Sequence, residues 1–176
     1  MIFACYIQGC ILVIRKMTFT ADDMFFMQRA IQLALDAELE GNSPVGSVIV
    51  LDNKIIAESG NKALSPIYDP GGHAEMSAMN KVEKSLWFRA RGMTCYTTLE
   101  PCCMCFGRLL LAGVGRIVFG ALDTMGGSGC LIPHLPKFYH QDNTPEFVGP
   151  IAADQCDELY KRTAATFNKV ISRISS

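Results

Sequence analysis

The sequence predicts an α/β fold in which a mixed sheet is covered by helices on both faces. Helical and strand-like segments alternate after a first hairpin, a pattern typical of sheets packed between helices. The chain has 176 residues, of which 49% are hydrophobic, enough for one substantial core. No internal repeat or low-complexity segment interrupts this pattern. We therefore expect residues 17–176 to form a single domain.

The first predicted helix begins at Thr20, whose hydroxyl can cap it while Asp23 occupies the acidic position of a capping box. Apolar residues then recur at helical spacing and define one apolar face: Met24, Met27, Ile31, Ala34, Leu35 and Leu39. Gly41-Asn42 should end the helix.

A hairpin and a loop follow this helix. Residues 45–51 and 54–59 are β-rich and flank Asp52-Asn53, a pair typical of tight turns. Prolines and glycines break residues 60–72, which predicts a loop.

The second half of the chain predicts three helices and three strands. Residues 73–82 favour a helix and residues 93–98 a strand. Pro101 suits the first position of a helix that runs to Ala112, because no hydrogen-bond donor is needed there. The remaining expected elements are strands over 116–119 and 146–148, an irregular segment over 123–145, and an amphipathic helix over 153–174 with Cys156, Tyr160, Ala164, Phe167 and Ile171 on one side.

Residues 1–16 are expected to be an N-terminal extension outside the native chain, with Met17 as the true start. Their apolar stretches are too short for a membrane span, which needs about 20 apolar residues. Arg15 and Lys16 follow the apolar part instead of preceding it, unlike a secretory signal. We therefore expect no membrane association.

The composition indicates a reduced, cytoplasmic protein. Its eight cysteines do not resemble a disulfide scaffold in a chain of this size, and the cluster at 102–105 suits a metal. The net charge is −1 and the basic residues are scattered. Because non-specific nucleic-acid binding depends on clustered positive charge, this distribution argues against it.

The most informative motif combines His73, Cys102 and Cys105. Zinc accepts imidazole nitrogen and thiolate sulfur readily, and three protein ligands leave a fourth position for water, as in catalytic zinc sites. The two cysteines lie three residues apart in a predicted first helical turn, where free N–H groups stabilise thiolates. The sequence therefore predicts one Zn²⁺ per chain, and ligand type alone leaves iron open.

Glu75 is predicted to be the proton shuttle beside this metal. Zinc lowers the pKa of its bound water from 15.7 to about 7, so that hydroxide forms near neutral pH. Glu75 follows His73 by two residues and is not needed as a ligand, so its carboxylate can take the proton of the water and return it to a leaving amine. The pattern H-x-E…P-C-x-x-C is the signature of zinc nucleobase deaminases.

Beyond the motif, residues 22–172 resemble the cytidine deaminase-like superfamily, in the branch of tRNA adenosine deaminases, guanine deaminases and fungal-type cytosine deaminases. The resemblance rests on Pro44-Val45-Gly46, Gly60-Asn61, Asp69-Pro70, Thr97 to Cys102, and Gly115 to Ala121. It implies a three-layer α/β/α sandwich around a five-stranded mixed sheet. It also implies His73, Cys102 and Cys105 as zinc ligands, Glu75 as proton shuttle, Asn61 in contact with the base or sugar, and a homodimer.

The predicted reaction is hydrolytic deamination, in which zinc hydroxide attacks the amine-bearing ring carbon and ammonia leaves. The scattered charge, and Leu122 where tRNA-type enzymes often carry Arg, favour a small-molecule base or nucleoside of the cytosine, guanine or adenine type. A tRNA-specific adenosine deaminase is the less favoured alternative. A third hypothesis, from another class, is a zinc-stabilised binding module without chemistry, in which Cys103 or Cys130 would supply a fourth ligand.

Overall fold

A computed structural model describes residues 6–7, 10–11, 19–139 and 144–174, and its centre is a five-stranded sheet of order β4-β3-β5-β6-β7. The strands are β3 (Gly46–Leu51), β4 (Lys54–Gly60), β5 (Thr94–Leu99), β6 (Arg116–Ala121) and β7 (Glu146–Val148). β3 runs antiparallel to β4 and β5, whereas β5, β6 and β7 are parallel. The prediction of a five-stranded mixed sheet is confirmed.

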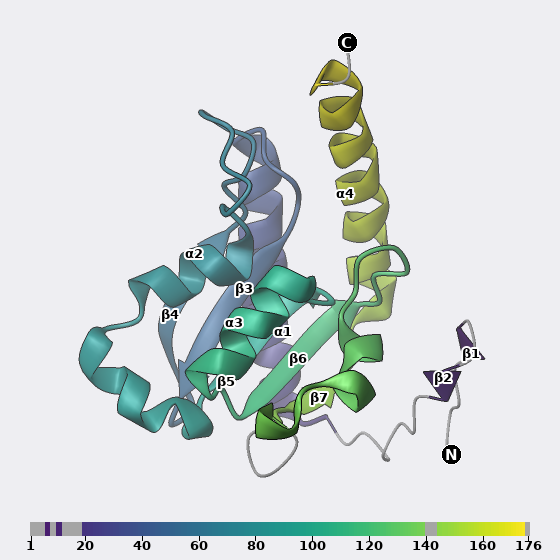
Figure 1. Ribbon diagram of the computed structural model, residues 1–176. Helices are drawn as coiled ribbons and strands as arrows, with labels where there is room; N and C mark the ends of the chain where they lie inside the picture. The colour runs from purple at the N-terminus through teal and green to yellow at the C-terminus, as the bar shows by residue number, and fades with distance from the viewer. Residues whose placement is uncertain (1–5, 8–9, 12–18, 140–143, 175–176) are drawn as a thin grey trace.

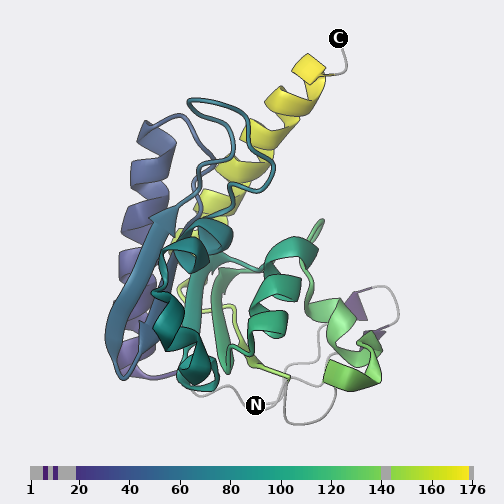
Figure 2. The same cartoon turned by 60° about the vertical axis from the view of Figure 1, so that its left-hand side comes forward.

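Helices cover both faces of this sheet, as Figures 1 and 2 show. They are α1 (Ala21–Leu39), α2 (Ala74–Lys81), α3 (Cys103–Ala112) and α4 (Ala153–Ile174). α1 and the first turns of α4 pack on one face, and α2 and α3 pack on the other. The arrangement is the predicted three-layer α/β/α sandwich.

Alternation along the strands divides the core between the two faces. In β3, Val48 and Val50 pack on the side of α1, whereas Ile49 and Leu51 pack on the side of α2 and α3. Every residue of β3 is buried, because successive side chains point to opposite faces and both faces are covered.

The parallel pairing of β5 and β6 positions the functional end of the molecule. α3 connects these two strands, so the segments that leave their carboxyl ends lie at the same edge of the sheet. In open α/β sheets, ligands bind outside the carboxyl ends of the strands. The segment from Glu100 to Cys102 follows β5 at this edge, and the segment from Leu122 onward follows β6.

Two expectations about α1 differ from the structure. Leu35 and Leu39 were expected on its apolar face, but their exposed fractions are 38% and 88%. Where the helix faces the hairpin it instead buries Ala30, Ala34 and Ala37, because a Cβ atom on Gly46 would lie 2.0 Å from Ala30 O and one on Gly60 would lie 2.8 Å from Ala37 Cβ. This close approach of helix and hairpin leaves no room for leucine at those positions of the helix.

Further differences concern helix starts and short helices. Pro101 does not open α3, because Cys102 is the N-cap and the helix begins one residue later. The sequence did not predict the 3₁₀ helix η1 (Lys84–Gly92), and two more, η2 (Gly129–His134) and η3 (Lys137–Tyr139), lie in the segment expected to be irregular. In α4, Phe167 is 58% exposed, since the C-terminal part of this helix extends beyond the sheet (Figure 1).

Little of the expected N-terminal extension is described. Strands β1 (Tyr6–Ile7) and β2 (Cys10–Ile11) pair with each other in antiparallel fashion. The rest of residues 1–16 lies outside the described residues, so the extension and the domain start at Met17 stay predictions. Within the described part of the chain, no helix combines the length and apolar character needed to cross a membrane.

Candidate active site

The two helices on one face of the sheet each begin with a residue of the predicted metal site. His73 is the N-cap of α2 and Cys102 is the N-cap of α3. Their carbonyl oxygens accept the first helical hydrogen bonds, from Ser77 N and Phe106 N respectively, both at 2.9 Å. Cys105 follows in the first turn of α3, so the side chains of three potential ligands converge where the helices start.

The distances between the three donor atoms fit one zinc ion. His73 Nδ1 lies 3.5 Å from Cys102 Sγ and 3.6 Å from Cys105 Sγ, and all three atoms lie within 4.8 Å of one another. Tetrahedral zinc with Zn–N of about 2.05 Å and Zn–S of about 2.3 Å places nitrogen and sulfur about 3.5 Å apart. The donor set and its spacing are therefore those of a zinc site.

No fourth protein ligand joins this set among the residues that the structure describes. Cys103 and Cys130, which could have closed the site, are exposed and lie outside the group. Three ligands with an open fourth position are the arrangement of a catalytic zinc, whereas structural zinc usually has four protein ligands.

Glu75 is buried beside the metal ligands. Cys105 Sγ donates to its Oε2 at 3.5 Å, and its exposed fraction is 4%. Burial raises the pKa of Glu75 above its usual value, because a charged carboxylate loses hydration there. A carboxyl group with a raised pKa exchanges protons more readily near neutral pH.

The two thiols have very different proton affinities. A hydrogen bond from Cys105 and, to a smaller extent, one with His73 lower the pKa of Cys102 to about 4. The same thiol–thiol contact, together with burial, raises the pKa of Cys105. Hydrogen bonding to Cys102 also raises the pKa of His73. One thiolate is thus available at neutral pH, and a divalent cation would stabilise the second.

Asn61 lies at the base of the loop that leads to His73. It is 6% exposed, its backbone N–H donates to Val45 O at 2.8 Å, and its Oδ1 accepts from Ala63 N at 2.9 Å. The loop closes through a hydrogen bond from Lys62 N to Gly72 O at 2.7 Å, one residue before His73. A Cβ atom on Gly72 would lie 2.7 Å from Lys62 O, so only glycine fits this closure.

Sequence reasoning did not anticipate how the loop after β6 attaches to the metal-binding segment. The Glu100 carboxylate accepts from Asp123 N at 3.1 Å and from Gly129 N at 2.8 Å. Ser128 Oγ donates to Pro101 O at 2.6 Å, and Cys102 pairs with Gly127 in an isolated β-bridge. The glycines at 126, 127 and 129 were the sequence feature that could have indicated this attachment. Residues without a side chain let the loop backbone approach the Glu100 carboxylate closely.

Residues 20–121 match the family described as the cytidine and deoxycytidylate deaminase zinc-binding region. The chain belongs to this deaminase family. It is accordingly a zinc-dependent hydrolytic deaminase, as the sequence predicted, and His73, Cys102 and Cys105 are positioned to hold the zinc.

Relatives and solved structures agree with this assignment. The chain is 38% identical to the tRNA-specific adenosine deaminase of Bacillus subtilis over 138 residues, which are 76% of this chain and 83% of the relative. The corresponding enzyme of Haemophilus influenzae is 36% identical, with 77% of this chain and 79% of the relative covered.

A structure from a study of A-to-I editing by tRNA:A34 deaminases matches with a TM-score of 0.65 and 31% identity over 77% of this chain and 99% of that one. Guanine deaminase from Bacillus subtilis matches with a TM-score of 0.53 and 36% identity over 57% of this chain and 65% of that one. The predicted reaction is confirmed, but these relatives support the alternative tRNA substrate better than the favoured free base or nucleoside.

Proposed function

We propose that this deaminase converts adenosine to inosine in the anticodon loop of a tRNA. The observation that carries the proposal is the similarity to tRNA-specific adenosine deaminases, which extends over about three quarters of the chain and includes the zinc-binding segments. The open, three-ligand site supports it, because the target base must leave its stack and enter a pocket beside the metal.

Glu75 is the proposed catalytic residue. When bound, zinc supplies a water of lowered pKa at the open position. Glu75, within 3.5 Å of a zinc ligand and buried, is placed to accept a proton there and to deliver it to the departing amine. Its raised pKa suits both transfers.

Asn61 is the proposed substrate-binding residue. Its carboxamide oxygen is engaged by Ala63 N, so the amide NH₂ is the part of this side chain that can donate to the base or sugar. Its place in the loop that closes beside His73 supports this role. Both Asn61→Ala and Asn61→Asp should raise KM, because each loses the NH₂ donor. Asn61→Asp keeps the oxygen that accepts from Ala63 N, so this variant should keep the turn and its zinc content.

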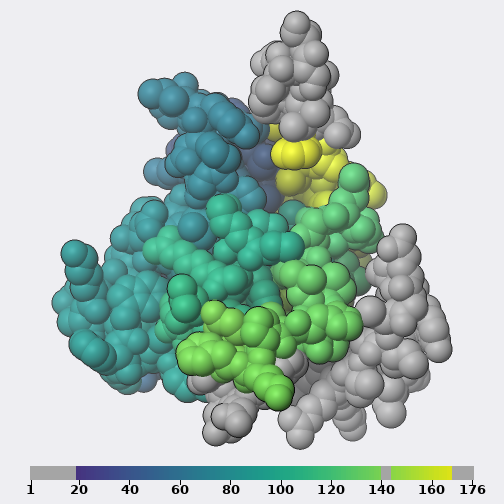
Figure 3. Space-filling model, viewed as in Figure 1, coloured from purple at the N-terminus to yellow at the C-terminus, as the bar shows by residue number. Residues whose placement is uncertain are grey.

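A homodimer is proposed through the exposed side of α3. Cys103, Met104, Gly107 and Leu111 are exposed along this helix, and a Cβ placed on Gly107 meets nothing within 4 Å among the described residues outside its own stretch of helix. Figure 3 shows α3, in teal, at the centre of the face toward the viewer with nothing over it. An uncharged stripe meets its own copy without like-charge repulsion, which suits a two-fold interface.

Sedimentation equilibrium tests the dimer. Leu111→Lys should shift the mass to that of a monomer, whereas Lys54→Glu on the edge strand β4 should not. A monomeric wild-type chain would exclude this part of the proposal. The thiols of Cys95, Cys102, Cys103, Cys105, Cys130 and Cys156 are free, which supports the proposal of a reducing, cytoplasmic location.

The substrate is tested with an anticodon stem-loop RNA that carries adenosine at the wobble position, alongside free adenosine, guanine and cytosine. We expect inosine in the RNA by mass spectrometry, and RNA binding that weakens steeply with salt. Ammonia release from a free base alone would contradict the proposal.

Cys102→Ser should lose zinc, and Cys103→Ser, a neighbouring thiol outside the donor set, should retain it.

A further inference from the structure

The loop from Asp123 to Gly129 is held from the inside by the metal-binding segment. Glu100 binds both ends of this loop, and Cys102 pairs with Gly127 near its middle. A Cβ atom on Gly127 would lie 2.3 Å from Glu100 Oε2, so the loop wraps the carboxylate without space for a side chain. The loop is therefore attached directly to the segment that carries Cys102, and it forms a wall beside the metal-binding residues.

The same loop is held from the outside by α4. Tyr160 Oη donates to Asp123 Oδ1 at 3.0 Å and lies 3.2 Å from Thr124 Oγ1. Asp123 Oδ1 also accepts from Met125 N and Gly126 N, both at 3.0 Å, so one carboxylate oxygen joins the turn to the helix. Because hydrogen bonds to a charged group are stronger than neutral ones, this contact is well suited to fix the turn.

α4 itself packs on the face of the sheet opposite to α2 and α3. Cys156 and Leu159 are buried in the core shared with α1, and Arg162 Nε donates to Glu38 Oε1 at 2.7 Å. Tyr160 lies between these anchors, one residue after Leu159. The helix thus presents the tyrosine hydroxyl to the loop from a fixed position.

We propose that Tyr160 is a positioning residue that fixes the Asp123–Gly129 wall for the nucleotides flanking the target adenosine. The inference rests on the proposed function for its substrate. Met125, at the turn of the wall, is 88% exposed and lies two residues from the partner of Cys102, so it is available to RNA at the mouth of the site. Tyr160 has no contact with Glu75 or the zinc ligands, so it acts on substrate binding and not on proton transfer.

The test compares Tyr160→Phe with Thr163→Val, a matched control that removes another α4 hydroxyl, one that donates to Leu159 O within its own helix. Hydrogen–deuterium exchange should become faster in Tyr160→Phe for peptides covering residues 123–129, and zinc content should stay the same. For the stem-loop RNA, KM should rise about tenfold, as expected for a lost hydrogen bond to a carboxylate, while kcat changes by less than about twofold. Thr163→Val should show neither change.

A double substitution sharpens the test. In an Asp123→Ala background the acceptor is already absent, so adding Tyr160→Phe should raise KM by less than about twofold more. Unchanged exchange over residues 123–129 in Tyr160→Phe would overturn the inference, as would a loss of kcat at unchanged KM. The exchange measurement needs no substrate, so it decides the positioning of the loop even if the stem-loop RNA proves not to be deaminated.

Discussion

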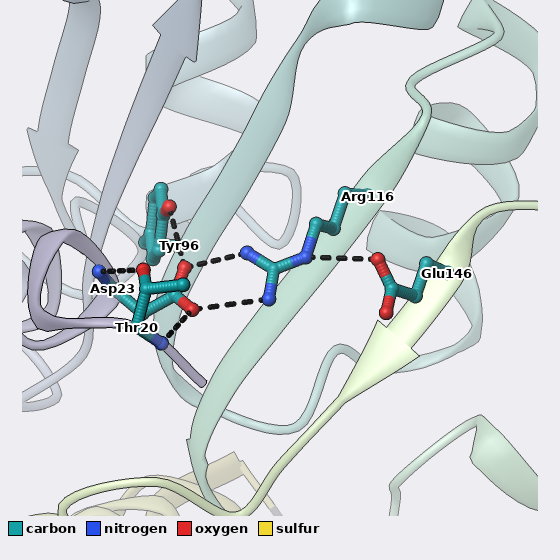
Figure 4. Close-up of polar contacts among 5 residues, drawn as sticks. All are labelled: Thr20, Asp23, Tyr96, Arg116 and Glu146. Atoms are coloured by element: carbon teal, nitrogen blue, oxygen red, sulfur yellow. Dashed lines mark hydrogen bonds and ion pairs between the residues drawn. The ribbon is translucent and has the colours of Figure 1, made fainter. Parts of the chain in front are cut away.

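Two buried carboxylates at opposite ends of the central sheet have opposite proton affinities. Asp23, at the start of α1, accepts hydrogen bonds from Thr20 N at 2.8 Å, from Tyr96 Oη at 2.8 Å, and from the Arg116 guanidinium at 2.5 and 3.1 Å (Figure 4). Burial alone would raise the pKa of Asp23, but these donors, led by Arg116, lower it to about 2. Its negative charge is thus fully satisfied.

Glu75 is as hidden from solvent as Asp23 but lies deeper among protein atoms. Besides a backbone contact, its carboxylate receives a side-chain hydrogen bond from one weak donor, the Cys105 thiol. Burial therefore prevails and raises its pKa. The difference shows that the supply of donors, together with the depth of burial, decides what a buried carboxylate does. A fully paired group anchors the fold, whereas an underpaired one keeps the capacity to take up a proton.

The largest expected effect tests the proton-transfer side of this comparison. Glu75→Gln keeps the shape of the side chain but cannot accept a proton, so kcat should fall by roughly 10²–10⁴-fold. Zinc content and the free energy of unfolding should not fall, because the variant removes a buried charge without emptying its space. Activity within tenfold of wild type would remove Glu75 from the mechanism.

The second largest expected effect tests the role of Asp23 in stabilising the fold. Asp23→Ala leaves the guanidinium of Arg116, whose side chain is 21% exposed, without its buried partner, and the free energy of unfolding should fall by about 3–5 kcal/mol. Denaturant titration measures this loss. At a temperature where the variant is folded, kcat should match that of wild type, since Asp23 lies away from the metal ligands.

The pH dependence of the free energy of unfolding should distinguish Asp23 from Glu75 further. Because the pKa of Asp23 is about 2 in the folded protein and 3.8 as a reference, its contribution is complete above about pH 4 and is lost as the pH falls toward 2. The contribution amounts to about 2 kcal/mol. Asp23→Asn should abolish it, so the two unfolding curves should converge in acid. Parallel curves down to pH 2 would exclude this linkage.

The smallest effect comes from a matched ion pair at the surface. Arg89 Nη2 contacts both carboxylate oxygens of Asp52, at 2.9 and 2.8 Å, but the two side chains are 55% and 62% exposed. Asp52→Asn suits the left-handed turn that Asp52 occupies, with φ of 51°, and should change the free energy of unfolding by less than about 0.5 kcal/mol. A loss as large as that of Asp23→Ala would show that burial is not the source of the difference.

The catalytic end was more predictable than the anchoring end. His73, Glu75, Cys102 and Cys105 follow a local spacing whose chemistry can be recognised before any fold is known. The capping role of Asp23 was equally local and is confirmed. Its contact with Arg116 joins residues 93 positions apart, and nothing in the periodicity of α1 or β6 indicates that pairing.

Periodicity also could not orient α1 about its own axis. Apolar spacing predicts that a helix has a buried side, but close packing against Gly46 and Gly60 decides which residues form it. Likewise, the attachment of the loop after β6 to Glu100 depends on the parallel neighbours β5 and β6. Such contacts follow from the assembled sheet and not from either segment alone.

Two of the three residues positioned to hold zinc are the N-caps of helices that pack directly on the sheet, and the third is in the first turn of one of them. Other surroundings of the site come from separate stretches of chain, the loop before His73 and the loop after β6. Altering the length or composition of those stretches should therefore leave the positions of the metal-binding side chains unchanged. The scaffold thus offers a route to engineered base editors in which substrate choice is redesigned while the hydrolytic centre is retained.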